Sequence, residues 1–182
     1  NAILKIKQQV VFWESNFTKK AVNNRKIIDF YNIVKVRPTL VHQFLLWNVE
    51  PILSDADTAY LQDPTPLFND EADFEVQCDS KEFYQIPFGV DPVPWQVNLG
   101  YYKIHPTKTV MKLIPIWFKR MYDAPKVQDQ SALRKVLKSF PTNWLNNDTI
   151  IVNTTLLLGD EYSKLTFRFL DPMLITNAGG LY

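Results

Sequence analysis

A short apolar segment that ends in two acidic residues constrains this chain more than any other feature. Residues 50–54 have the length of a buried strand and lead directly into Asp55-Ala56-Asp57. Side chains two residues apart in extended backbone point to the same side, so both carboxylates can reach one hard cation such as Mg²⁺ or Mn²⁺. Ligands of open α/β sheets bind at strand ends. We therefore expect Asp55 and Asp57 to form a metal site.

Strand and helix patterns alternate along the rest of the chain, which is typical of an α/β fold. Apolar residues recur at helical spacing in two long segments and in a third that follows Pro38, and other runs have strand length. We expect helices over residues 39–47, 106–122 and 129–140, and extended segments over 9–14, 26–30, 73–78, 97–104 and 164–170. The 73–78 segment alternates, so we expect one of its faces to be solvated.

The size and charge of the chain exclude several classes of partner. Its 182 residues, 46% of them apolar, suffice for one domain with a buried core. A net charge of +1 gives no basis for nucleic-acid binding. No run of about 18 apolar residues occurs. We expect membrane association only through segments outside this chain, which we interpret as a piece of a longer protein.

Cysteine, histidine and asparagine residues narrow the chemistry further. A single cysteine, Cys78, excludes an internal disulfide framework. Two histidines, His42 and His105, are too few and too far apart in sequence to indicate a histidine-based metal site. Glycosylation acceptor sequences begin at three asparagines, which favours the secretory pathway and the Golgi lumen as the location: Asn16, Asn147 and Asn153.

Two chemistries use an acidic pair after an apolar strand. One is nucleotide-sugar transfer, in which a metal neutralises the departing diphosphate. The other is phosphoryl transfer of the haloacid-dehalogenase type, in which the first aspartate is the nucleophile. That second pattern requires Asp-x-Asp-x-Thr, whereas here Ala59 occupies the last position and Thr58 comes one residue early. The phosphatase interpretation is therefore disfavoured.

Four blocks in order make the chain resemble the nucleotide-diphospho-sugar transferase family, which includes plant cell-wall xylosyl- and arabinosyltransferases. Together they extend over roughly residues 35–180. The blocks are Ile52–Pro64, Asn98-Leu99-Gly100-Tyr101-Tyr102, Asp129-Gln130-Ser131-Ala132-Leu133, and Leu170-Asp171-Pro172 with Asn177. The resemblance implies a GT-A-like fold, which is a Rossmann-like α/β arrangement of an open mixed sheet flanked by helices. We expect residues 1–182 to form one partial domain of this type, incomplete at both ends.

The resemblance also implies roles for individual residues. It implies that Asp55 and Asp57 bind the metal. It also implies that Asp129 and Gln130 are catalytic residues near the donor sugar. The implied donor-binding residues are Arg37, Asp55, Asn98 and Gly100. Each of three residues also has a purely structural interpretation. Asn98 can satisfy backbone groups of a strand, Asp129 can cap a helix and Arg37 can form a surface ion pair.

The function implied by the resemblance is metal-dependent glycosyl transfer, with Mn²⁺ or Mg²⁺ as cofactor. The donor would be a nucleotide-diphospho-sugar, in particular a UDP-sugar that carries a hexose or a pentose. The acceptor would be a glycan or glycoprotein, and the anomeric configuration would be retained. The alternative from another class is a catalytically inactive module of the same fold that only binds nucleotide or sugar.

Overall fold

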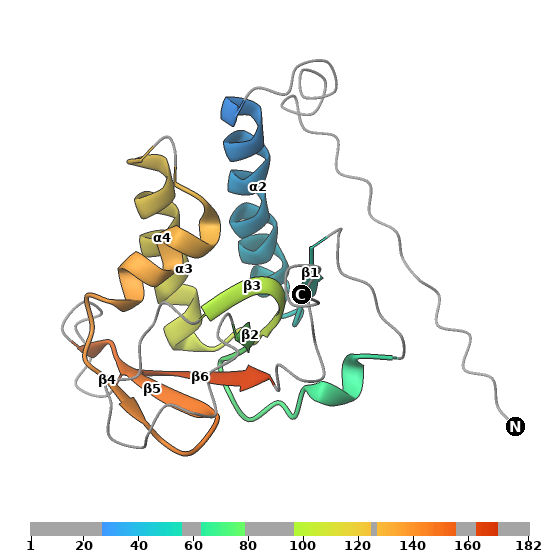
Figure 1. Cartoon of the computed structure of the whole chain (residues 1–182), viewed down its shortest axis with the longest axis vertical. Coiled ribbons are helices and arrows are strands. Elements are labelled where there is room, and N and C mark those ends of the chain that lie inside the picture. Colours follow the sequence, from blue (N-terminus) through green and yellow to red (C-terminus); the bar gives the residue numbers. More distant parts are fainter. Residues whose placement is uncertain (1–26, 56–62, 79–96, 125–126, 156–162, 171–182) are drawn as a thin grey trace, which may run out of the picture.

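The computed structural model describes residues 27–55, 63–78, 97–124, 127–155 and 163–170 (Figure 1). The helical elements in these ranges are α2 (Ile27–Leu46), the 3₁₀ turn η1 (Thr65–Leu67), α3 (Lys108–Tyr122) and α4 (Asp129–Leu137). The strands are β1 (Ile52–Ser54), β2 (Phe74–Cys78), β3 (Val97–Ile104), β4 (Thr142–Trp144), β5 (Thr149–Asn153) and β6 (Lys164–Leu170). The expected α/β fold, an open mixed sheet flanked by helices, is confirmed.

The six strands form one sheet in the order β1-β3-β2-β6-β5-β4. β2 and β6 pair in parallel, and every other neighbouring pair is antiparallel. Because β3 runs against both β1 and β2, the strands β1, β2 and β6 all point the same way. Their carboxyl ends share one edge of the sheet, which is where open α/β sheets bind ligands.

The three described helices gather on one side of the sheet (Figure 1). Thr107 caps α3, since its side chain accepts a hydrogen bond from the Val110 amide. The apolar side of α3 is buried in the main core, and the stacked rings of Phe74 and Phe167 on adjacent strands belong to the same core. The buried residues of α3 are Val110, Leu113, Ile114, Trp117 and Met121.

The opposite face of the sheet is covered by the segment around η1. Tyr101 points away from the main core and packs with Leu170, Leu67 and Phe68. The Phe68 and Tyr101 ring centroids are 5.1 Å apart. Both faces of β2 and β3 are therefore buried, so the polar side chains of these strands are not solvated, contrary to the expectation for residues 73–78.

Three local expectations were wrong. The segment from Ile27 to residue 30 is the first turn of α2 rather than an extended piece. Pro38 lies inside that helix instead of opening it, which leaves one carbonyl of the preceding turn without its usual amide donor. β1 is an edge strand with Ile52 43% exposed, rather than a buried strand.

The remaining elements agree with the sequence, apart from one hairpin. The helices expected over 106–122 and 129–140 and the strands expected over 97–104 and 164–170 are present. The β4–β5 hairpin was not foreseen, because its strands are only three and five residues long and neither alternates between apolar and polar residues. The segment 9–14 lies outside the described ranges. Within those ranges, no helix has both the length and the apolarity needed to cross a bilayer.

Candidate functional site

Six of the seven residues that the sequence singled out are described, and they lie around one end of β1 and β3. Arg37 comes from α2 and Asp55 directly follows β1. Asn98 and Gly100 lie on β3, and the last two open α4: Asp129 and Gln130. Asp57 lies outside the described residues. Four segments that are distant in sequence thus contribute to one cluster, which we call the Arg37 cluster.

Arg37 connects these segments through its guanidinium group. Its Nη2 forms an ion pair with Asp55 Oδ1, and its Nη1 lies 3.2 Å from Asp129 Oδ2. Nη1 also donates a hydrogen bond of 3.1 Å to the Leu99 carbonyl. The ion pair that sequence alone allowed for Arg37 therefore exists, but its partners are two other predicted site residues.

Burial and charge together set the protonation of this cluster. Burial raises the pKa of Asp129, and the positive charge of Arg37 opposes that shift. Burial lowers the pKa of Arg37, but the negative charges around it, Asp129 first, outweigh burial and leave its pKa raised. Burial also raises the pKa of the Tyr102 hydroxyl well above its ordinary value. Arg37 therefore stays cationic and Tyr102 stays neutral.

Gly100 lies where polar oxygen atoms approach β3 most closely. A Cβ atom at this position would lie 2.9 Å from Asn98 Oδ1, 3.1 Å from Gln77 Oε1 and 3.3 Å from Asp55 Oδ2. The Gly100 amide donates to Asn98 Oδ1 at 2.6 Å, and its carbonyl accepts from the Asp55 amide at 2.7 Å. Only a residue without a side chain leaves these three oxygens undisturbed.

Two further contacts hold the start of α4, one to β3 and one to α3. Gln130 Oε1 accepts a hydrogen bond of 2.9 Å from the Leu99 amide. Asp129 is the first residue of the helix rather than its cap, which is Gln128. The carbonyl of Asp129 accepts a 2.8 Å hydrogen bond from Trp117 Nε1, which fixes the start of α4 against α3. The carboxylate of Asp129 is thereby held beside Arg37.

Gln77 is a member of this cluster that sequence reasoning missed. It is 3% exposed and pairs with Asn98 across the β2–β3 ladder. The alternation of residues 73–78 assigned Gln77 to a solvated face, whereas the η1 segment covers that face. The signal that could have identified Gln77 is its position opposite Asn98 on the neighbouring strand. That position is known only once the strand order is known.

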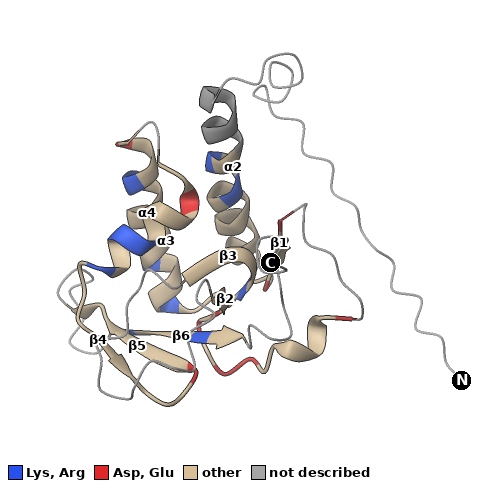
Figure 2. Cartoon of the chain, in the orientation of Figure 1, with Lys and Arg blue, Asp and Glu red and all other residues tan. Residues whose placement is uncertain are grey.

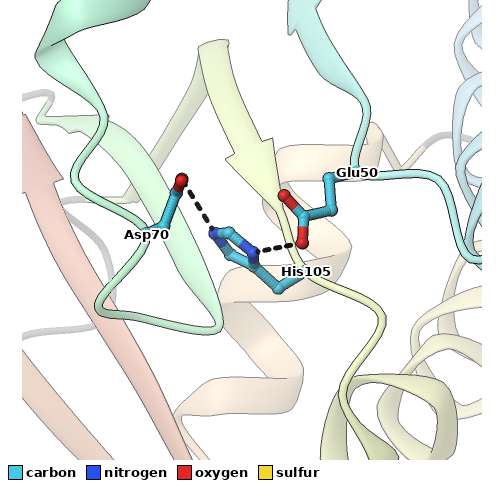
Figure 3. A group of neighbouring side chains, drawn as sticks. All are labelled: Glu50, Asp70 and His105. Atoms are coloured by element: carbon cyan, nitrogen blue, oxygen red, sulfur yellow. Dashed lines mark ion pairs between the residues drawn. The ribbon is translucent and has the colours of Figure 1, made fainter.

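A second cluster lies at the opposite edge of the sheet, where β1 and β2 begin and β3 ends (Figure 3). Acidic residues gather along the segment between η1 and β2 in this part of the molecule (Figure 2). Glu50, Asp70 and His105 offer ligand atoms that all lie within 4.8 Å of one another, a group that fits a divalent metal ion. The number and spacing of the two histidines gave no indication of this group, because its other members are carboxylates from distant segments.

A profile of the nucleotide-diphospho-sugar transferase family matches residues 2–181. The chain belongs to this family. Searches of curated proteins and of solved structures gave no match. Membership in the nucleotide-diphospho-sugar transferases implies glycosyltransferase activity, with a nucleotide-sugar as donor and a second molecule as acceptor.

The Arg37–Asp129 pair generates a prediction about stability. Arg37→Gln should lower the free energy of unfolding by about 1–3 kcal/mol, because it leaves the Asp129 carboxylate buried without its cation; the partial exposure of Arg37 keeps the loss below that of a fully buried pair. Arg37→Gln combined with Asp129→Asn should cost less than the sum of the two single changes. Urea denaturation of the four proteins measures this coupling.

The exposed Lys119–Asp123 pair on α3 is the matched control. Its own double-mutant cycle should give no more than about 0.5 kcal/mol. Equal coupling energies in the two cycles would contradict the bridging role of Arg37.

Proposed function

We propose that this protein is a metal-dependent glycosyltransferase that moves a hexose or pentose from a UDP-sugar to a glycan or glycoprotein, with retention of configuration. The observation that carries the proposal is the convergence of Arg37, Asp55 and Asp129 at the carboxyl end of β1, beside Gly100. A cation, carboxylates and close backbone approach are what a metal-bound diphosphate and a sugar require.

The described residues fit a hard divalent cation at Asp55. Its Oδ1 pairs with Arg37, while its Oδ2 faces the space above Gly100 and its side chain is 40% exposed. That geometry leaves one carboxylate oxygen within reach of an ion, and Asp57 would supply a second carboxylate. Bound Mn²⁺ or Mg²⁺ would neutralise charge on the departing diphosphate. Oxygen ligands suit both ions, and we propose Mn²⁺ first.

Arg37 would add a second positive charge for the diphosphate. A guanidinium has five N–H donors, and the hydrogen bonds to Asp55 and Leu99 use two of them, while Asp129 Oδ2 is an ion-pair partner 3.2 Å from Nη1. The other donors would be available to phosphate oxygens. Arg37 would therefore hold the acidic residues in place and stabilise negative charge on the leaving group.

The side of the cluster formed by β3 and α4 would hold the donor sugar. Asn98 and Gly100 would line the pocket, with Gln77 beside them, because sugar hydroxyls both donate to and accept from carboxamides. Asp129 and Gln130, at the amino end of α4, would lie next to the sugar carbon that reacts. Retention would make the departing diphosphate, rather than a side-chain nucleophile, central to the reaction.

Location and domain extent are part of the same proposal. We propose residues 1–182 as a single partial GT-A domain that works in the secretory pathway, in the Golgi lumen. Two of the three glycosylation acceptor residues, Asn147 and Asn153, are exposed and therefore open to modification. The third, Asn16, lies outside the described ranges.

The competing function is a module of the same fold that binds nucleotide or sugar without turnover. Titration of UDP with and without Mn²⁺, followed by hydrolysis and transfer assays over a panel of UDP-sugars, separates the two. Metal-dependent binding with turnover of at least one donor supports the enzyme. Metal-dependent binding without turnover of any donor supports the inactive module.

The acidic pair provides the first test of the site. Asp57→Ala should abolish Mn²⁺-dependent UDP binding in isothermal titration, because one carboxylate alone holds the ion weakly, while the circular dichroism spectrum remains that of the parent. Asp123→Ala, at the exposed end of α3, is the control and should bind as the parent does. Unchanged binding by Asp57→Ala would refute the proposed metal ligands.

Gly100 provides the second test, which addresses the sugar rather than the nucleotide. Gly100→Ala should lower donor turnover at least about tenfold, or about 1.4 kcal/mol, because the added Cβ displaces the Asn98, Gln77 and Asp55 oxygens. UDP binding with Mn²⁺ should fall less than turnover. Comparison of kcat/KM for the UDP-sugar with the Kd for UDP checks this. If kcat/KM for the UDP-sugar and the affinity for UDP fell by the same factor, Gly100 would not be a sugar-binding residue.

A further inference from the structure

We propose that Asp70 and His105 bind a second divalent cation, of the zinc type, at the edge of the sheet opposite the Arg37 cluster. This site is independent of the proposed transferase function and would persist if that function were wrong. It joins the segment before β2 to the end of β3, with Glu50 next to it (Figure 3).

The orientation of the His105 ring is the first argument. Its Nδ1 lies 3.2 Å from Glu50 Oε1. A carboxylate only accepts, so Nδ1 carries the hydrogen in this contact, and in the neutral imidazole that binds a metal Nε2 presents its lone pair. A histidine that donates one ring N–H to a carboxylate while the other nitrogen binds metal is the usual arrangement at protein metal sites. Glu50 thus acts as a positioning residue.

The lack of a partner for Nε2 is the second argument. The His105 side chain is only 10% exposed, yet Nε2 has no hydrogen-bond partner among the residues that the structure describes. Asp70 Oδ1 lies 3.9 Å away and Glu75 Oε1 3.6 Å away, both beyond hydrogen-bonding distance. Two ligands that each lie about 2.1 Å from one metal are separated by about 3.4 Å at a tetrahedral angle. The observed separations are close to that value.

The charge balance is the third argument. The ion pairs around His105 join four carboxylates to two cations, which leaves a charge of −2 when His105 is neutral. A divalent cation neutralises this charge. The carboxylates are Glu50, Asp70, Glu75 and Asp148, and the cations are Lys103 and Arg168.

Lys103 already contacts two carboxylates of this cluster and would compete with a metal ion for them. Its Nζ pairs with Asp70 Oδ1 and lies 3.1 Å from Glu50 Oε2. The hydrogen bond from Lys103 also lowers the pKa of both carboxyl groups, which keeps them ionised. Nevertheless Lys103 leaves Nε2 unsatisfied, and a carboxylate can accept from an ammonium while it binds a metal. A bound cation would therefore share the Asp70 carboxylate with Lys103.

The ligand types select the metal. An imidazole nitrogen with carboxylate oxygens favours Zn²⁺ over Mg²⁺ and Ca²⁺, which prefer oxygen ligands alone. Asp70 is 61% exposed, so an ion can enter from solvent and complete its coordination with water.

Histidine side-chain NMR of the full chain tests the proposal, since the sequence holds only two histidines. During titration with Zn²⁺ alone at pH 7.5, the His105 ring signals should shift and saturate at one equivalent. His42, which packs edge-on against Phe118 on the helical side, is the internal control and should not move. The same titration of Asp55→Asn should give the same His105 shift, which separates this site from the proposed donor metal.

Asp70→Asn supplies the second measurement. It should raise the dissociation constant for Zn²⁺ at least about tenfold, because one charged ligand is lost, without a change in the fold. Asp70 is exposed, so this variant should fold as the parent does. The proposal is overturned if His105 signals do not respond to millimolar Zn²⁺, or if Asp70→Asn binds Zn²⁺ as tightly as the parent.

Discussion

The interaction on which the site depends is the pairing of the Arg37 guanidinium with two carboxylates, Asp55 and Asp129. Asp55 directly follows β1 and Asp129 begins α4. Burial raises the pKa of Asp129 and the negative charge of Asp55 raises it further, whereas the positive charge of Arg37, which pairs with both carboxylates, opposes these shifts. Arg37 comes from α2, so the position of that helix on the sheet determines the geometry of the acidic residues. The helix layer therefore supports the site directly as well as completing the core.

The strand β3 organises the other half of the site. Val97, Leu99, Tyr102 and Ile104 of β3 belong to the main core, whereas Tyr101 packs on the face covered by η1, and the pairing with β2 shifts register in this part of the strand. Within this buried strand, Gly100 leaves a space that the oxygens of Asn98, Gln77 and Asp55 surround. Burial of a polar group costs free energy unless the group forms hydrogen bonds. A buried polar cluster of this kind is therefore stable only where backbone groups or a ligand supply those hydrogen bonds.

Sequence alone predicted the α/β class and the long helices, because amphipathic periodicity in α3 and α4 is strong and local. It also predicted six residues that the structure brings together, through a family resemblance carried by short blocks. Their roles in binding and catalysis remain predictions. The β4–β5 hairpin was missed, since strands as short as these carry little periodic signal.

Features that depend on tertiary placement could not be read from the chain. The pattern around Gln77 indicated a solvated face, and only the covering segment at η1 makes that face buried. The Glu50, Asp70 and His105 cluster is similar: three residues far apart in sequence meet because β1 and β2 begin at the edge where β3 ends. Such meetings follow from strand order and direction, which local patterns do not encode.

The most direct measurement of the central claim is paramagnetic broadening of backbone amide NMR signals by Mn²⁺ in the presence of UDP. The account predicts that UDP confines the broadening to the carboxyl end of β1, the adjacent part of β3 and the first turn of α4, with Gly100 and Gln130 among the residues most affected. Broadening that is absent from this region while UDP is bound, or that falls only at the opposite edge of the sheet, would contradict it.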